Sequence, residues 1–241
     1  MTIKETLKHP EIQKIKRILC KINTNFHNAE PNIGELKTNG YEFEWKRNKD
    51  SSTPISRREY MDTHPEIQNP FDFSFSLAAD DIIAQKIPMG VMGCTGVAKL
   101  FAKYAKEENL DCSVVFTAKI NDLEEKKKDK NAIISGHQII AVKFSDGVRM
   151  FDPANPNGLQ FYKDANGQEI QVPSMKDLIG KKLVSQNSND PWAQRQAGTI
   201  ITSIEDSSKL ASIKTYKDVE NHYLTNEFLQ QMKKIQITNN K

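Results

Sequence analysis

The segment Gly90-Val-Met-Gly93-Cys94-Thr-Gly96 places a cysteine between glycines, at the first turn of the strongest helical pattern in the chain. The unpaired N–H groups and the dipole of a helix start favour negative charge, so they lower the pKa of a thiol there. The same N–H groups can bind the oxyanion that forms when a nucleophile attacks a carbonyl. Gly93 and Gly96 leave room for a substrate backbone to come close. We therefore expect Cys94 to be a nucleophile rather than a small apolar core residue.

The helix that presents Cys94 is expected over residues 94–109, where apolar and charged side chains separate at helical spacing. Its apolar face holds Cys94, Val97, Ala98, Phe101 and Ala105, and its charged face holds Lys99, Lys103, Lys106 and Glu107. A helix with one apolar stripe buries that stripe against another element. We expect this helix to pack on the strands that follow it.

Those strands are marked by apolar and β-branched residues. They are expected at Cys112–Ala118, Ala132–Phe144 and Val148–Asp152, with a weaker pair at Leu159–Tyr162 and Gln168–Val172. Asp146-Gly147 is a strong signal for a two-residue hairpin turn, so the strands on either side of it should be antiparallel. The charged run Glu124–Lys130 is expected to be a solvated loop.

The rest of the chain adds helices around this set. Helices are expected near residues 12–22 with Pro10 in the first turn, over 76–85 with Ser76 as cap, and over 174–181 and 216–235. Residues 28–69 are expected to be mostly loops, with one short strand at Tyr41–Trp45. The order of elements predicts an α+β fold in a single domain spanning 1–241.

Composition excludes several classes of protein. The 241 residues are 37% hydrophobic and 27% charged, with a net charge of only +3, which argues against a nucleic-acid binder. No stretch approaches the roughly 20 apolar residues of a membrane span, and the first residues lack the apolar region of a secretory signal. The three cysteines are widely spaced and form neither a metal-ligand pair nor a disulfide framework, so we expect no metal and a reducing compartment.

Two blocks of sequence match a known pattern. The first contains Ala79-Asp-Asp-Ile-Ile83, Gly93-Cys94, Ala98-Lys-Leu-Phe101-Ala-Lys-Tyr104 and Asn109-Leu-Asp-Cys-Ser-Val-Val115; the second contains Gly136-His137-Gln-Ile-Ile-Ala-Val142 and Val148-Arg-Met-Phe-Asp152-Pro153. Over residues 72–153 the chain resembles the core of the papain-like transglutaminase superfamily. The order Cys, His, Asp and the intervals of 43 and 15 residues between them also fit that family.

The resemblance implies both a fold and a set of roles. It implies a nucleophile-bearing helix on an antiparallel sheet, with a core over about 72–172 and extensions over 1–71 and 173–241. It makes Cys94 the nucleophile, His137 the base and acid, and Asp152 the residue that orients the histidine. The backbone N–H of Cys94 would bind the oxyanion, and Gln85, Gly93 and Gly136 are further candidates for oxyanion or substrate binding.

The expected hairpin conflicts with part of this assignment. A two-residue turn at Asp146-Gly147 places Asp152 opposite Ala141, on the same face as His137 but about four residues, or ~13 Å, along the strand. A triad with Asp152 therefore requires a different turn or a bulge. If the tight turn holds, Asn155 or Asn157 becomes the candidate orienting residue, because an amide can serve that role.

The implied activity is attack on an amide bond through a thioester, without a cofactor, on a protein or peptide substrate. Hydrolysis or deamidation is favoured over crosslinking, because the added domains and calcium sites of animal transglutaminases are absent from the sequence. Alternatives are an acetyltransferase with a similar triad, a non-catalytic interaction protein, and a bacterial effector. The expected location is the cytoplasm, or outside the cell by export without a cleaved signal; the sequence leaves the oligomeric state open.

Overall fold

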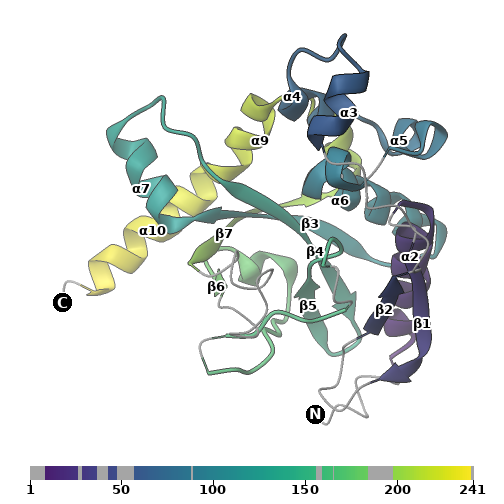
Figure 1. The fold of residues 1–241 in the computed structure, drawn as a ribbon. Helices are drawn as coiled ribbons and strands as arrows, with labels where there is room; N and C mark the ends of the chain where they lie inside the picture. Colours follow the sequence, from purple (N-terminus) through teal and green to yellow (C-terminus); the bar gives the residue numbers. More distant parts are fainter. Residues whose placement is uncertain are drawn as a thin grey trace.

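The computed structural model describes residues 9–26, 29–36, 43–47, 57–87, 89–155, 159–164, 166–183 and 198–239. Within these ranges the chain has an α+β fold, in which helices surround a curled five-stranded antiparallel sheet (Figure 1). The strand order is β5-β4-β3-β7-β6. The strands are β3 (Cys112–Lys119), β4 (Gly136–Phe144), β5 (Gly147–Phe151), β6 (Lys182–Leu183) and β7 (Thr199–Asp206).

The helices precede, interrupt and follow this sheet. They are α2 (Pro10–Phe26), α3 (Arg57–Thr63), α4 (Pro70–Ser76), α5 (Ala79–Gln85), α6 (Met89–Glu107), α7 (Ile120–Lys128), α9 (Tyr216–Tyr223) and α10 (Asn226–Asn239), with 3-10 turns η1 (Met175–Leu178) and η2 (Ser207–Ser212). A separate two-stranded sheet pairs β1 (Ala29–Leu36) with β2 (Phe43–Arg47). None of the helices in the described ranges is long and apolar enough to cross a bilayer.

Strands β3 and β4 form the centre of the molecule because both of their faces are buried. Val114 and Phe116 belong to the core shared with α2 and α6, whereas Val115 belongs to a second core on the opposite face. That second face is covered by η1, β6 and the segment 159–172, which supplies Tyr162, Ile170 and Val172. Successive strand residues point to opposite faces, so continuous apolar runs in β3 and β4 are what a doubly covered sheet requires.

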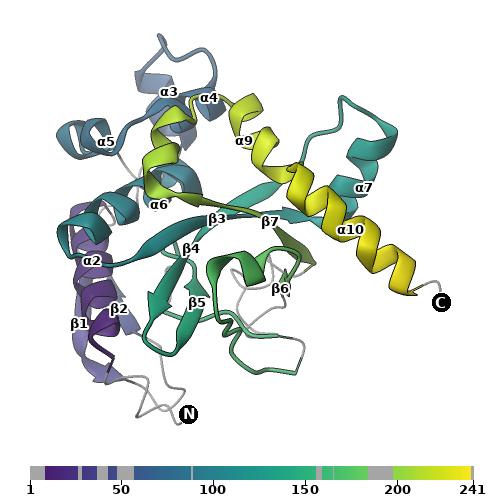
Figure 2. The same cartoon turned by 180° about the vertical axis from the view of Figure 1, so that it is seen from behind.

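The helix α2 packs against α6 and confirms the amphipathic pattern expected near residues 12–22. It begins at Pro10, and Ile12, Ile15 and Ile22 are fully buried. Figure 2 shows α2 at the C-terminal end of α6, on the side of the molecule remote from α7 and α10. The helix α6, which carries Cys94, therefore packs against β3 and β4 of the sheet and, at its C-terminal end, against α2.

Several expected elements differ in the structure. The charged run Glu124–Lys130, expected to be a loop, lies mostly in α7, where Leu123 is buried and three lysines occupy the last turn, next to the negative end of the helix dipole. Ser76 does not cap a helix over 76–85; it ends α4, and α5 starts after Ala78. Strand β7, which lies next to the central β3, is missing from the sequence-based expectation, although its Thr and Ile residues are β-branched and typical of strands.

The ends of the chain also differ from expectation. Region 28–69 contains β1, β2 and α3 besides loops, and part of the strand expected at Tyr41–Trp45 falls outside the described residues. The single helix expected over 216–235 is divided into α9 and α10, because the Thr225 hydroxyl accepts a hydrogen bond from the Phe228 N–H and starts a new helix. The helix expected over 174–181 is only the short turn η1.

One residue placed on the charged face of the helix is in fact buried. The Lys99 side chain is 5% exposed, and its ammonium donates to the carbonyl oxygens of Phe75, Leu77 and Ile213 at 2.6, 2.9 and 3.1 Å. These bonds tie α6 to the end of α4 and to the segment after η2. Burial, and then the nearby Lys214 charge, lower the pKa of Lys99 to about 8.

This lowered pKa predicts a pH-dependent contribution to stability. Because an unfolded lysine keeps its ordinary pKa of 10.5, the unfolded chain binds more protons than the folded chain between pH 8 and 10.5. The free energy of unfolding, measured by urea denaturation, should therefore rise with pH across this window relative to a Lys99→Met variant, by roughly 2–3 kcal/mol. A difference between the two proteins that does not change with pH would contradict the lowered pKa of Lys99.

Candidate functional site

Cys94 lies where α6 changes direction. Gly93 has φ 63° and ψ −172°, a conformation outside the helical region that is essentially restricted to glycine. The helix resumes at Cys94, so the thiol is on the first residue of the uninterrupted part, as the sequence predicts. The N–H groups of this new first turn are at the positive end of the helix dipole.

The start of β4 brings the histidine to this thiol. The side chains of Cys94 and His137 form a hydrogen bond with each other. On its other side, His137 Nε2 lies 2.6 Å from Asp152 Oδ2, and the Asp152 side chain is almost fully buried. Because Nε2 faces the carboxylate, Nδ1 is the ring nitrogen that can exchange a proton with the thiol. The structure thus joins Cys94, His137 and Asp152 in one chain of contacts.

The register of the hairpin differs from the expected one and places Asp152 nearer to His137. The turn residues are Ser145 and Asp146, and Gly147 already pairs with Phe144. Continuing the register places Asp152 opposite Ile139, two residues from His137 on the same face, which is diagonal contact distance across antiparallel strands. The expected turn at Asp146-Gly147 is therefore wrong.

One local and one longer-range interaction account for the register. Arg149 pairs with Asp146 through two hydrogen bonds of 2.7 Å, which holds the turn at Ser145 and Asp146. Gly147 has φ 140° and lies so close to the Val172 carbonyl that an added Cβ would be 2.8 Å from its oxygen. Of the alternative orienting residues, Asn155 donates its backbone N–H to the Asp152 carbonyl, and Asn157 is outside the described residues.

The charges in the site favour a thiolate–imidazolium pair. Burial by itself would raise the pKa of the Cys94 thiol, but the His137 charge, its hydrogen bond and the Gln138 peptide N–H together lower it below the usual value. Burial opposes the charged form of His137, yet the Asp152 and Cys94 charges raise the histidine pKa well above its usual value. The two shifts have the signs that a nucleophile and its proton acceptor require.

A second set of polar contacts surrounds the thiol and has no counterpart in the sequence-based expectation. The Cys94 thiol and the Thr95 hydroxyl both donate to Gln138 Oε1, each at 2.8 Å. Gln138 Nε2 in turn donates to the Tyr223 hydroxyl at 3.0 Å, from helix α9. Gln138 directly follows His137 and could have been noticed for that reason, whereas nothing in the sequence marks Tyr223.

The thiol opens onto a cavity of about 560 Å³, which we call the Cys94 cavity. Its walls come from α4, α6, α9 and the segment leading into β4. They are formed by Asn69, Ser74, Phe75, Met92, Gly93, Cys94, Thr95, Ile133, Ile134, Ser135, Gly136, Gln138, Tyr216 and Tyr223. Of the expected binding glycines, Gly93 and Gly136 line this cavity. Gly136 also has to be glycine, because a Cβ there would overlap the Tyr223 ring.

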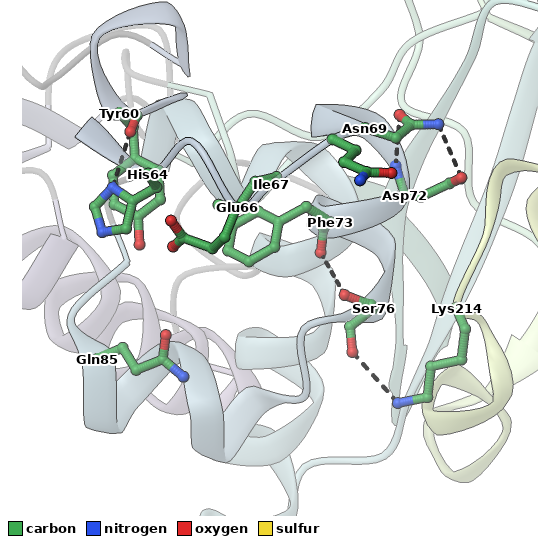
Figure 3. A pocket seen from close by; sticks show the side chains of 11 residues that line it. Tyr60, His64, Glu66, Ile67, Asn69, Asp72, Phe73, Ser76, Gln85 and Lys214 are labelled. Carbon is green, nitrogen blue, oxygen red and sulfur yellow. Dashed lines mark hydrogen bonds between the residues drawn. The ribbon is translucent and has the colours of Figure 1, made fainter. Parts of the chain in front are cut away.

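Two other expected binding residues lie elsewhere. Gln85 is exposed at the end of α5 and lines a different pocket, together with Lys214 and Glu66 (Figure 3). It therefore has no part in the walls of the Cys94 cavity. Gly96 is buried, and an added Cβ would be 2.5 Å from the Met92 side chain, so this glycine permits packing rather than approach of a substrate.

The site contains no evident metal-binding group. Within the described ranges, His, Cys, Asp and Glu side chains do not gather into a cluster of three or more that could hold an ion. The other two cysteines are partly buried and have raised pKa values: burial raises that of Cys20, and burial with the charges of Asp111 and Asp206 raises that of Cys112 to about 12. Cys94 is thus chemically distinct from both.

Comparisons with protein families, with curated proteins and with solved structures find no match to this chain. Any functional conclusion therefore has to come from the contacts described above. Among them, the hydrogen-bonded series from Cys94 through His137 to Asp152 is the one with the clearest chemical meaning.

The contact between Asp152 and His137 predicts a measurable shift. Asp152→Asn removes the carboxylate charge that raises the histidine pKa, so the pKa of His137 should fall by about one unit or more in an NMR titration of the ring protons. Asp111→Asn is the matched control, because Asp111 is exposed at the other end of β3. An unchanged His137 titration in Asp152→Asn would show that the two side chains are not paired in solution.

Proposed function

We propose that the chain is a cysteine-nucleophile enzyme of the papain-like transglutaminase type, which cleaves amide bonds through a thioester. The observation that carries the proposal is the 2.6 Å contact between His137 and Asp152, on a histidine that is itself hydrogen-bonded to Cys94. A buried carboxylate, an imidazole and a thiol in that order are the parts of an activated nucleophile.

The proposed reaction has two steps. The Cys94 thiolate, whose proton His137 already holds, attacks the substrate carbonyl; the C–N bond then breaks as His137 gives that proton to the leaving amine. In the second step His137 takes a proton from water, whose oxygen attacks the thioester; the C–S bond then breaks and the sulfur leaves as a thiolate, which restores the thiolate–imidazolium pair. The products are a carboxylic acid and an amine, so the overall reaction is hydrolysis of a peptide bond or deamidation of a side-chain amide.

The surrounding groups support this assignment. The Cys94 N–H, at the start of the resumed helix, is in a position to stabilise an oxyanion next to the sulfur. Asp152 keeps the imidazole oriented, and its Oδ1 is itself held by the Ala154 N–H at 2.8 Å. The carboxylate is thus fixed at both oxygens, which gives the histidine one preferred orientation.

An activated ester tests the proposal without knowledge of the natural substrate. With p-nitrophenyl acetate, the protein should release a burst of p-nitrophenol close to its own concentration, and mass spectrometry should place the acetyl group on Cys94. Cys94→Ala should abolish the burst, and His137→Ala should slow it by about 100-fold or more. Cys20→Ser, which leaves the site intact, is the control. A burst that survives in Cys94→Ala would refute the proposal.

Alkylation distinguishes the three cysteines through their pKa values. At about pH 6, iodoacetamide should modify Cys94 at least tenfold faster than Cys20 or Cys112, because only the Cys94 pKa is lowered. The rate at Cys94 should rise with pH through a midpoint below that of a free thiol. Equal labelling of the three residues in the folded protein would contradict the thiolate–imidazolium pair.

Gln138 provides a further test that keeps the shape of the site. Gln138→Glu places a carboxylate against the sulfur and so disfavours the thiolate, which should move the midpoint of the alkylation profile upward by about one pH unit or more. Glu124→Gln, an opposite change of charge on the exposed part of α7, should leave the midpoint unchanged. A Gln138→Glu profile identical to that of the original protein would remove Gln138 from the site.

A further inference from the structure

Apart from the Cys94 thiolate itself, the described walls of the Cys94 cavity carry no charged side chain. The fourteen described lining residues include no lysine, arginine, histidine, aspartate or glutamate. Several contribute large apolar or aromatic surface, among them Phe75, Met92, Ile133 and Ile134. A charged group placed there would lose its hydration without gaining a partner, so the cavity disfavours ionised substrates.

Most of the polar side chains in the wall already have partners within the protein. The Tyr216 hydroxyl donates to the Ile134 carbonyl and accepts from the Ile134 N–H. Gln138 is occupied by Cys94, Thr95 and Tyr223. Each of these groups already has partners within the protein, which reduces the hydrogen bonding that it can offer to a ligand.

The same is true on the side formed by α4. Ser74 donates to the Val91 carbonyl at 2.6 Å. Asn69 donates to the Asp72 carboxylate at 2.8 Å and accepts from the Asp72 N–H at 3.2 Å. Although this wall contains several polar residues, it therefore offers a bound molecule mainly apolar contacts.

Ile133 at the edge of the cavity points to the same conclusion. Its side chain is 72% exposed, and it is the large hydrophobic residue that stands out to solvent in the described part of the chain. It lies in the segment between α7 and β4, three residues before Gly136, and lines the Cys94 cavity. An apolar ligand seated in the cavity would cover part of this surface.

We propose that the Cys94 cavity binds the acyl side of the substrate and selects an uncharged, apolar acyl group. This inference rests on the proposed thioester chemistry, since the group next to the attacked carbonyl must lie beside Cys94. The favoured substrates are amides whose carbonyl carries an aliphatic or aromatic group, and carboxylate-bearing or amine-bearing acyl groups are excluded.

A matched series of esters tests the acyl preference. The rates at which p-nitrophenyl acetate, hexanoate and the adipate monoester acylate Cys94 are each divided by the rate with glutathione, to remove differences in intrinsic reactivity. Hexanoate should react about tenfold faster than acetate, and the carboxylate of the adipate ester should remove that advantage. Equal normalised rates for hexanoate and acetate would overturn the apolar subsite while leaving the thioester proposal intact.

Variants at the edge of the cavity test whether the preference for hexanoate over acetate depends on Ile133. Ile133→Glu should lower the hexanoate preference at least about threefold, because it replaces apolar contact with a charge. Asn131→Glu adds the same charge to an exposed neighbour that does not line the cavity, and it should leave the preference unchanged. Equal effects of the two variants would assign the change to long-range charge and would contradict the subsite.

A binding experiment decides the inference even if Cys94 proves unreactive. Hexanamide, which is neutral, is titrated into the Cys94→Ala protein carrying ¹³C-methyl methionine, so that it can bind but cannot be cleaved. The Met92 methyl resonance, assigned with Met92→Leu, should shift with hexanamide and not with acetamide. Met175, which lies by the second core, is the internal control. An unmoved Met92 resonance would refute the apolar subsite, whereas failure of every ester to acylate Cys94 would refute the thioester function.

Discussion

The register between β4 and β5 is the constraint on which the candidate site depends. Sheet register works in steps of one residue, and a single step would turn Asp152 to the opposite face of the sheet. A shift of two residues that paired Asp152 with Ala141 would keep the face but move the carboxylate beyond reach of His137. The observed turn at Ser145 and Asp146 keeps Asp152 on the same face as His137 and within its reach, and the buried Arg149 side chain holds that turn. A structural ion pair at one end of the hairpin thus sets the distance between two functional groups at the other end.

The nucleophile depends on a different kind of constraint, a local break in a helix. Gly93 leaves the helical conformation, and this makes Cys94 the first residue of a new helical segment directly against the start of β4. The Lys99 ammonium, one turn further along α6, fixes the same helix to three carbonyl groups of neighbouring segments. The position of the sulfur is therefore determined from both directions along α6, by backbone geometry before it and by buried hydrogen bonds after it.

The sequence predicts the parts of the site that are determined locally. The glycine before Cys94 and the helical pattern after it are adjacent in the chain, so the start of a helical segment at Cys94 could be inferred. The hairpin turn could not, because it depends on the Val172 carbonyl close to Gly147 as well as on local residues. Gln138 shows the same limit: its partner Tyr223 is 85 residues away, and no spacing rule connects them.

The hydrogen bonds of Gln138 must change when the proton moves from Cys94 to His137. With a neutral thiol, Cys94 and Thr95 both donate to the amide oxygen, and the amide nitrogen donates to Tyr223. Once His137 has taken the proton, the sulfur needs donors, and the amide oxygen next to it becomes unfavourable. Rotation of the amide would then present its nitrogen to the sulfur and its oxygen to the Tyr223 hydroxyl, which can donate as well as accept. A phenol that burial keeps neutral allows both arrangements, so the hydrogen bond between Gln138 and Tyr223 can be kept in both protonation states.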